Sequence, residues 1–191
     1  PTFSDELIRG APSAFTVAAE KMEAFEVIRE ITTSTNIILD FTQDINGVEI
    51  LSVLKNIYAI AVGIVDAVIN SANTRFFLLT KAFNEIRFIL RTFGGSEDTL
   101  YKFCGFGDFT LTSLNDLSRN RTLGLMIGKG FYRDSFKSSV LLEGQRSVKI
   151  MYEKMVKLKY ANDLILLRNL YELLFNGLAV PEFIKNIIKT D

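Results

Sequence analysis

Two kinds of hydrophobic pattern alternate in the first forty residues. Residues 13–19 (SAFTVAA) and 36–42 (NIILDFT) are apolar and partly β-branched, and residues 20–32 between them carry apolar side chains at helical spacing. Apolar, β-branched runs favour strands, and a period of about 3.6 residues favours a helix. The sequence therefore predicts a strand–helix–strand unit of an open α/β sheet, although two strands alone do not make a stable sheet.

From residue 48 onward the pattern is helical. Residues 48–69 are apolar on nearly every side, which favours a helix that is buried all round. The length would also suit a membrane span. However, Lys55 and Asp66 lie within it, and a central Lys or Asp costs roughly 2.5–3.5 kcal/mol on insertion scales. We therefore expect a core helix and no membrane span. Further helices are predicted over residues 74–93, 96–103, 118–129, 143–159, 164–175 and 181–188.

Turn and capping residues mark several of these boundaries. Ser96 follows a Gly-Gly pair and is expected to be an N-cap. Asn176 and Gly177 are expected to end one helix, and Pro181 suits the first turn of the next.

The amino-acid composition limits the kinds of site and partner that the protein can have. Lys+Arg and Asp+Glu both number 22, so the net charge is zero and we expect no nucleic-acid partner. Cys104 is the only cysteine, which excludes an intrachain disulfide, fits a small buried side chain and suits a reducing cytoplasm. There is no histidine, which excludes Ser-His nucleophile pairs and His-ligated zinc, and we expect no metal site. Acid–base work falls to Lys, Asp, Glu, Tyr or Cys104.

Lys55 is the first candidate for that work. A lysine in an apolar helix must reach solvent, find an acid or lose its charge. Asp66 lies three turns further on nearly the same face, which is too far for direct contact. Two interpretations stay open: a lysine whose stem is buried and whose amine reaches solvent, or a general acid–base group with a lowered pKa.

A polar stretch, residues 105–124 (GFGDFTLTSLNDLSRNRTLG), stands out from the apolar chain. Ser118 is a natural N-cap, and Arg119, Asn120 and Arg121 then occupy the first turn of a helix. Cations oppose the helix dipole there, whereas free backbone N–H groups attract anions. A bound phosphate would explain the arginines, and a solvated helix start is the alternative. The Gly-x-Gly of this stretch lacks the third glycine of a dinucleotide fingerprint.

Four segments occur in the order PTFSDELIRGAPSAF, VEILSVLKNIYAIAVGIVDA, CGFGDFTLTSLNDLSRNRTLG and LLEG. Together they resemble motifs of the bacterial NAD(P)-dependent glycerol-3-phosphate dehydrogenases. VEILSVLKNIYAIAVGIVDA is similar to the family's VE-LKN-AIA-GI-DG helix, and CGFGDFTLTSLNDLSRNRTLG to its AGLGDL-LT-SRNR-G segment. LLEG is similar to its V-EG motif, and the starting PTFSDELIRGAPSAF to GPSFA-E--G-PTA. The resemblance implies a mainly α fold. Residues 1–42 would be a βαβ remnant of a Rossmann NAD(P)-binding domain, and residues 43–191 a multi-helix substrate domain like the C-terminal domain of 6-phosphogluconate dehydrogenase.

The resemblance also implies a site and a reaction. Lys55 would be the proton donor and acceptor at the C2 oxygen in the interconversion of sn-glycerol 3-phosphate and dihydroxyacetone phosphate, which supplies glycerophospholipid precursors. The cofactor would be NAD or NADP, bound mainly by a Rossmann domain that the sequence lacks, and a homodimer is a further expectation. The implied substrate-binding residues are Thr2, Asn56, Asp108, Thr112, Ser118, Arg119 and Asn120. The implied cofactor-facing residues are Ser4, Arg119, Leu141 and Glu143.

The chain also departs from the family. Ser71-Ala72 precede Asn73-Thr74 where the family usually has Gly and a polar residue, and Thr122 replaces a commonly basic residue. The family's GxGxxG turn and its other substrate lysine are not in this sequence. We therefore expect the isolated chain to lack dehydrogenase activity. Two alternatives are a non-catalytic helical dimerisation or pseudoenzyme module, and a related β-hydroxy acid dehydrogenase, for which the SRNR-like motif is a poor match.

Overall fold

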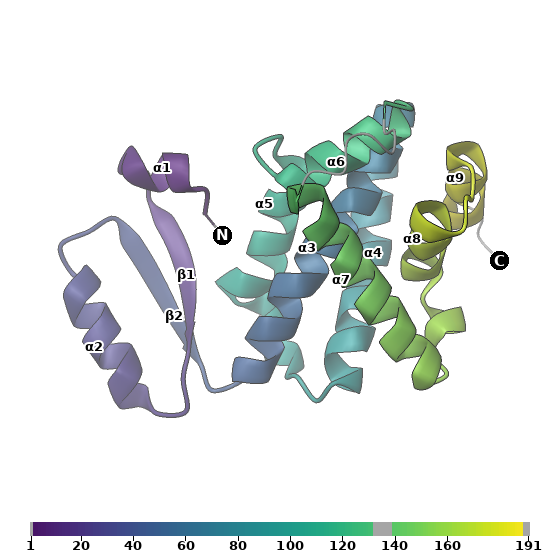
Figure 1. Cartoon of the computed structure of the whole chain (residues 1–191). Coiled ribbons are helices and arrows are strands. Elements are labelled where there is room, and N and C mark those ends of the chain that lie inside the picture. Colours follow the sequence, from purple (N-terminus) through teal and green to yellow (C-terminus); the bar gives the residue numbers. More distant parts are fainter. Residues whose placement is uncertain (1, 132–138, 189–191) are drawn as a thin grey trace. The chain divides into compact units, whose positions relative to one another are not determined.

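The structure, a computed structural model, describes residues 2–131 and 139–188, and only the backbone of residues 139–143 (Figure 1). It is mainly helical with one small parallel sheet, which confirms the predicted fold class. The chain forms two compact units. The first unit contains Pro1–Lys55 and Ile86–Thr112, and the second contains Asn56–Glu85 and Ser113–Asp191.

The first unit begins with the predicted strand–helix–strand. Strands β1 and β2 pair in parallel, with Ser13 opposite Ile37 and Ala18 opposite Thr42. A short helix, α1, precedes them and was not predicted. The bounds are α1 Ser4–Ile8, β1 Ser13–Ala18, α2 Met22–Thr32 and β2 Ile37–Thr42.

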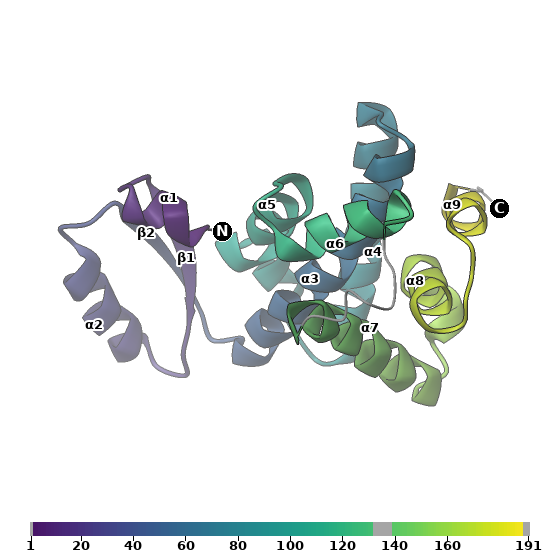
Figure 2. The ribbon, with the colours of Figure 1, turned by 45° about the horizontal axis from the view of Figure 1, so that its top comes forward.

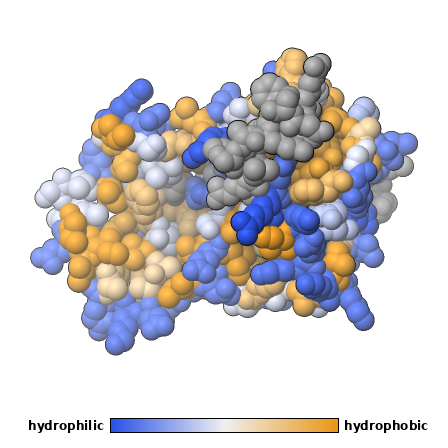
Figure 3. Space-filling model, viewed as in Figure 1, coloured by the Kyte–Doolittle hydropathy of each residue, from blue (hydrophilic) through white to orange (hydrophobic). Residues whose placement is uncertain are grey.

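Helix α2 lies along the sheet (Figure 1). Phe25 of α2 contacts Phe41 of β2, with ring centroids 5.4 Å apart. Apolar side chains also remain on the outside of α2: Val27 and Ile31 are 57% and 74% exposed. Hydrophobic residues are visible on the surface of the molecule in Figure 3. The helical spacing therefore predicted the helix correctly, but only one side of it is covered.

Helix α3, Ile45–Val68, begins before the predicted Val48 because Asp44 caps it. The Asp44 Oδ1 atom accepts a hydrogen bond from Gly47 N at 2.8 Å, as an N-cap does. Its Oδ2 atom accepts from Ser96 N and Thr99 Oγ1, both at 2.7 Å. One carboxylate thus joins the start of α3 to the segment after α4, Ala72–Thr92.

Residues 96–103 are not the predicted α-helix. Ser96 is an N-cap as expected, but it caps a 3-10 helix, Glu97–Tyr101, which a π-helical turn, Phe103–Gly107, follows. Helix α5, Asp108–Leu114, comes next and was not predicted. Its hydroxyl-rich sequence is typical of a loop, yet Thr110 Oγ1 donates to the carbonyl of Phe106 at 2.8 Å, so that hydroxyl bonds within its own turn.

The second unit contains the remaining helices, of which α7 contacts α8 and α8 contacts α9 (Figure 2). Asn176 follows α8, Gly177 takes a φ of 77°, and Pro181 lies in the first turn of α9, as predicted. Tyr58 and Phe183 are the largest of the fully buried side chains here. The bounds are α6 Arg119–Gly128, α7 Ser139–Lys157, α8 Ile165–Phe175 and α9 Val180–Ile188.

Length and composition alone would allow α3 to cross a membrane, and no other helix within residues 2–131 and 139–188 meets that test. However, 61% of its apolar window is buried inside the protein. This burial is what a core helix shows, in agreement with the expectation from the sequence.

Candidate functional site

Lys55 forms an ion pair with Asp108. Its Nζ atom lies 2.5 Å from Asp108 Oδ2, and the two side chains are 23% and 19% exposed. The structure therefore brings together two of the predicted site residues, one from α3 and one from the unpredicted helix α5. Partial exposure keeps both groups accessible to a ligand.

Thr112 lies one turn after Asp108 on the same face of α5, and it is 8% exposed. The segment before Asp108 is held by the sheet: Cys104 N donates to Thr16 Oγ1 at 2.9 Å, and Phe103 N to Asp40 Oδ2 at 3.3 Å. These bonds fix the approach of the chain to α5 and so place Asp108.

Gly105 is required by packing. A Cβ atom at this position would lie 2.2 Å from the carbonyl oxygen of Leu100. Its backbone also takes a non-helical conformation inside the π-helical turn. Gly105 of the GFG sequence therefore allows two backbone segments to approach closely.

Asn56 and Asn120 are also brought together. The Asn120 Nδ2 atom donates to Asn56 Oδ1 at 2.9 Å, which links α6 to α3. Gly144 of α7 lies against the same amide, because a Cβ there would be 2.4 Å from Asn120 Oδ1. The Asn120 side chain is thus held between two helices.

Ser118 is the N-cap of α6, as predicted, and it accepts from Arg121 N at 3.3 Å. Arg119 is the first residue of the helix and is exposed. Its side chain makes no hydrogen bond or ion pair with any residue that the structure describes. A free guanidinium at a helix start is suited to an anionic ligand.

Arg121 behaves differently from Arg119, and the sequence did not separate the two. Its side chain is 9% exposed, and Nη1 donates to Asp66 Oδ2 at 2.7 Å and to the carbonyl of Ser113 at 2.9 Å. Its Nε atom donates to Asp116 Oδ1 at 3.0 Å. Arg75 Nε contacts both oxygens of Asp66 at 2.8 Å. Asp66 lies inside the apolar helix α3, and its presence there could have predicted that a cation such as Arg121 is buried beside it.

Two glycines allow α3 and α6 to touch through their backbones. A Cβ at Gly63 would lie 2.3 Å from the carbonyl oxygen of Arg121, and one at Gly124 would lie 2.2 Å from that of Ile60. Since a backbone atom cannot rotate away, both positions require glycine. The close contact sets the distance at which the side chains of α3 and α6 meet.

The remaining predicted residues are Thr2, Ser4, Leu141 and Glu143, which lie at the start of the chain and in α7. Thr2 Oγ1 donates to Ser13 Oγ at 3.2 Å, beside the start of β1, and Ser4 begins α1 and is exposed. Leu141 and Glu143 lie in α7, but their side chains fall outside the described residues.

Two titratable groups, the buried Glu85 and the half-buried Cys104, were not predicted as site residues. Burial raises the pKa of Glu85 from 4.5 to about 7, although hydrogen bonds from Leu166, Leu167 and Tyr58 act in the opposite direction. The Glu85 carboxylate accepts from Leu166 N at 2.7 Å and Leu167 N at 3.1 Å, and so caps α8. Burial likewise raises the pKa of the Cys104 thiol. Cys104 is therefore kept as a neutral thiol and is a weak candidate for acid–base work.

The turn between β1 and α2 does not fit a dinucleotide pyrophosphate. Such a group needs a glycine-rich turn whose N–H groups point at it from the start of a helix. Here the connection contains Ala19, Glu20 and Lys21, and Glu23 lies in the first turn of α2. Within the described part of the chain, no group of three or more His, Cys, Asp or Glu side chains could hold a metal ion.

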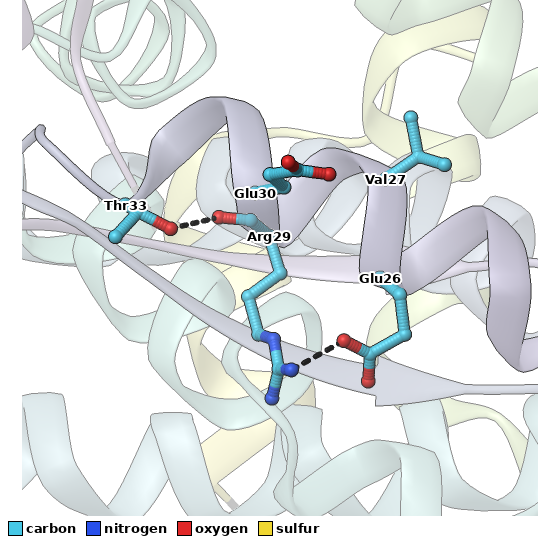
Figure 4. A pocket seen from close by; sticks show the side chains of 5 residues that line it. All are labelled: Glu26, Val27, Arg29, Glu30 and Thr33. Carbon is cyan, nitrogen blue, oxygen red and sulfur yellow. Dashed lines mark hydrogen bonds and ion pairs between the residues drawn. The ribbon is translucent and has the colours of Figure 1, made fainter.

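A surface hollow lies along α2 and is lined by Glu26, Val27, Arg29, Glu30 and Thr33 (Figure 4). Arg29 forms an ion pair with Glu26, and Thr33 Oγ1 donates to the carbonyl of Arg29 at 2.9 Å. None of the predicted site residues lines this hollow, and its one cation, Arg29, is paired with Glu26 of the same helix. It carries no functional assignment.

Comparisons with a family model, with curated proteins and with solved structures all match glycerol-3-phosphate dehydrogenases. Residues 44–185 match the model of a family described as NAD-dependent glycerol-3-phosphate dehydrogenase C-terminus. A protein of Methanothermobacter thermautotrophicus named glycerol-3-phosphate dehydrogenase (NAD(P)+) is 48% identical over 154 residues, which are 80% of this chain and 47% of that protein. One of the same name from Blochmanniella floridana is 31% identical over 99% of this chain and 57% of its own length.

Among solved structures, a glycerol-3-phosphate dehydrogenase of Coxiella burnetii superposes with a TM-score of 0.89 at 25% identity, covering all of this chain and 58% of that one. The Saccharomyces cerevisiae enzyme has a TM-score of 0.84 at 17% identity, which shows the fold alone. The chain spans about half the length of the curated relatives it matches.

Proposed function

This chain belongs to the family of NAD-dependent glycerol-3-phosphate dehydrogenases, matching their C-terminal domain, and we propose that it is the substrate-binding half of such an enzyme. The proposed reaction interconverts sn-glycerol 3-phosphate and dihydroxyacetone phosphate. Because the chain spans about half of its relatives, the other half is proposed to hold most of the NAD or NADP. In this chain, Ser4, Arg119, Leu141 and Glu143 would face the cofactor.

The observation that carries the proposal is the contact between Lys55 and Asp108. When a ketone is reduced to an alcohol, its oxygen gains a proton, and in the reverse reaction it loses one. The Lys55 ammonium would donate that proton at the C2 oxygen, and the neutral amine would take it back. Asp108, 2.5 Å from Nζ, holds the ammonium in one direction. Thr112, on the same face of α5, would contact the glycerol portion.

The phosphate group is assigned to the start of α6. Ser118 caps this helix by accepting from Arg121 N, and the other backbone N–H groups of the first turn would bind an incoming anion. Arg119 is exposed and has no partner among the described side chains, so it would contact that anion. Asn120 of α6 is hydrogen-bonded to Asn56 of α3. Arg121 is excluded from this role because its guanidinium is buried against Asp66.

The test uses this chain joined to the dinucleotide-binding half of the Methanothermobacter relative. Lys55→Met keeps most of the apolar stem and removes the amine, so kcat should fall by about 10²–10⁴-fold. The thermal midpoint should change little, because the amine is partly exposed. Turnover is followed by the absorbance of the reduced nicotinamide.

Lys157→Met, at an exposed position of α7, is the matched control and should keep full turnover. A Lys55→Met variant as active as this control would contradict the role of Lys55. The 191-residue chain alone should show no turnover, because it lacks a turn that fits the pyrophosphate.

A further inference from the structure

The charges around Arg121 are balanced within the protein. Asp66 contacts both Arg75 and Arg121, and Asp116 contacts Arg121. Two carboxylates therefore face two guanidinium groups, and the set has no net charge. Arg119 is an exposed cation at the start of α6, and its side chain has no ion pair with the residues that the structure describes.

Arg121 is also fixed at three points. Its N–H donates to the Ser118 side chain, and its guanidinium reaches Asp66. Its carbonyl oxygen lies so close to Gly63 that a Cβ there would be 2.3 Å away. The first turn of α6 therefore cannot rotate or slide without breaking a buried contact of Arg121.

We propose that Arg121 and Asp66 are positioning residues, which hold the first turn of α6 in the conformation that lets Arg119 and the backbone N–H groups bind phosphate. The inference rests on the proposed function, because it assigns the phosphate to that helix start. It adds that the two neighbouring arginines have different roles: Arg119 contacts the ligand, and Arg121 contacts only the protein.

A lysine could not replace Arg121 in this role. The guanidinium donates through two different nitrogens to Asp66, the Ser113 carbonyl and Asp116. A single ammonium keeps the charge but cannot reproduce that fork. Arg121→Lys therefore separates geometry from charge.

The experiment titrates the 191-residue chain with inorganic phosphate and with glycerol 3-phosphate. Backbone amide resonances of residues 118–121 are followed by NMR, and thermal unfolding is measured separately. Arg119→Gln should abolish binding without a loss of stability. Arg121→Lys should weaken binding at least about fivefold, the lower end of typical coupling between linked sites, and should displace these resonances in the free protein.

Arg75→Gln is the matched control. Arg75 contacts Asp66 from α4 and makes no hydrogen bond or ion pair with α6 in the described residues. Its removal should therefore lower the thermal midpoint and leave phosphate affinity unchanged. Asp116→Asn serves as a milder variant if Arg121→Lys does not fold, since the Asp116 side chain is 80% exposed. It should weaken binding less than Arg121→Lys.

The outcomes separate two failures. If the unaltered chain shifts no resonance of residues 118–121, the phosphate site of the proposed function is wrong, and the inference falls with it. If the chain binds and Arg119→Gln does not, the site stands. Unaltered affinity in both Arg121→Lys and Asp116→Asn would then overturn the positioning role alone, and so would an equal loss of affinity in Arg75→Gln.

Discussion

Glu85 should make the stability of this protein fall as the pH rises toward neutrality. Its pKa is raised from 4.5 to about 7 in the folded chain, chiefly by burial. Between these two values the folded state keeps a proton that the unfolded state has lost. The stabilising contribution is therefore complete below about pH 4.5, and is lost as the pH rises through about 7.

The size of the effect follows from the same values. A rise from 4.5 to about 7, at about 1.36 kcal/mol per pKa unit, corresponds to roughly 3 kcal/mol of unfolding free energy. Glu85→Gln has the same shape and cannot titrate, so this pH dependence should disappear. The amide can still accept from Leu166 N, but it has only one oxygen for the two backbone donors of α8. A constant cost of about 1 kcal/mol is expected from that lost acceptor.

The assay is urea unfolding followed by circular dichroism at a series of pH values. Other titrating groups affect both proteins equally, so the difference between wild type and Glu85→Gln isolates Glu85. That difference should shift by roughly 3 kcal/mol in favour of the variant as the pH rises from about 4.5 to about 7. Glu182→Gln, at an exposed site in α9, should show no such change. A Glu85→Gln difference that is the same at every pH would refute the reasoning.

Two further predictions concern the frame of the fold. Burial raises the pKa of Asp44, but hydrogen bonds from Thr99, Ser96 and Gly47 outweigh burial and lower it below its usual value of 3.8. Its contribution is therefore present above that value and lost as the pH falls through the lowered pKa. Asp44→Ala should cost roughly 1–2 kcal/mol in urea unfolding near neutral pH, and a loss that persists unchanged in strong acid would contradict this. Gly124→Ala would place a Cβ 2.2 Å from the Ile60 carbonyl, so it should cost roughly 1–3 kcal/mol by overpacking, and an unchanged thermal midpoint would show that α3 and α6 can separate freely.

The elements that could be predicted were those with a strong local signal. The strand–helix–strand start, the long apolar helix and the caps at Ser96 and Ser118 follow from spacing and side-chain chemistry, and the structure confirms them. Helix α5 could not be found in this way, because its hydroxyl-rich sequence reads as a loop. Its position depends on bonds to Asp40 and Thr16, which lie far away in the sequence.

The candidate site could likewise be predicted only in part, because the partners of its charged residues lie far away in the sequence. The sequence left open whether the Lys55 amine reaches solvent or acts as an acid–base group, and only the fold shows that it contacts Asp108. The sequence also suggested that a bound phosphate would explain both Arg119 and Arg121. In the structure, however, Arg121 forms an ion pair with Asp66 of the same chain. Local sequence shows that a buried charge must be compensated, and the tertiary structure decides which residue does so.

The alternation of the chain between its two units limits how the protein can be dissected. The chain passes from one unit to the other after Lys55, Glu85 and Thr112, so neither unit is a continuous segment. A fragment that starts at residue 43 would leave Phe103 and Cys104 without the acceptors that β1 and β2 supply. Exchanging one unit between relatives would accordingly require two separate segments to be transplanted together, and cutting at any single peptide bond would leave part of a unit behind.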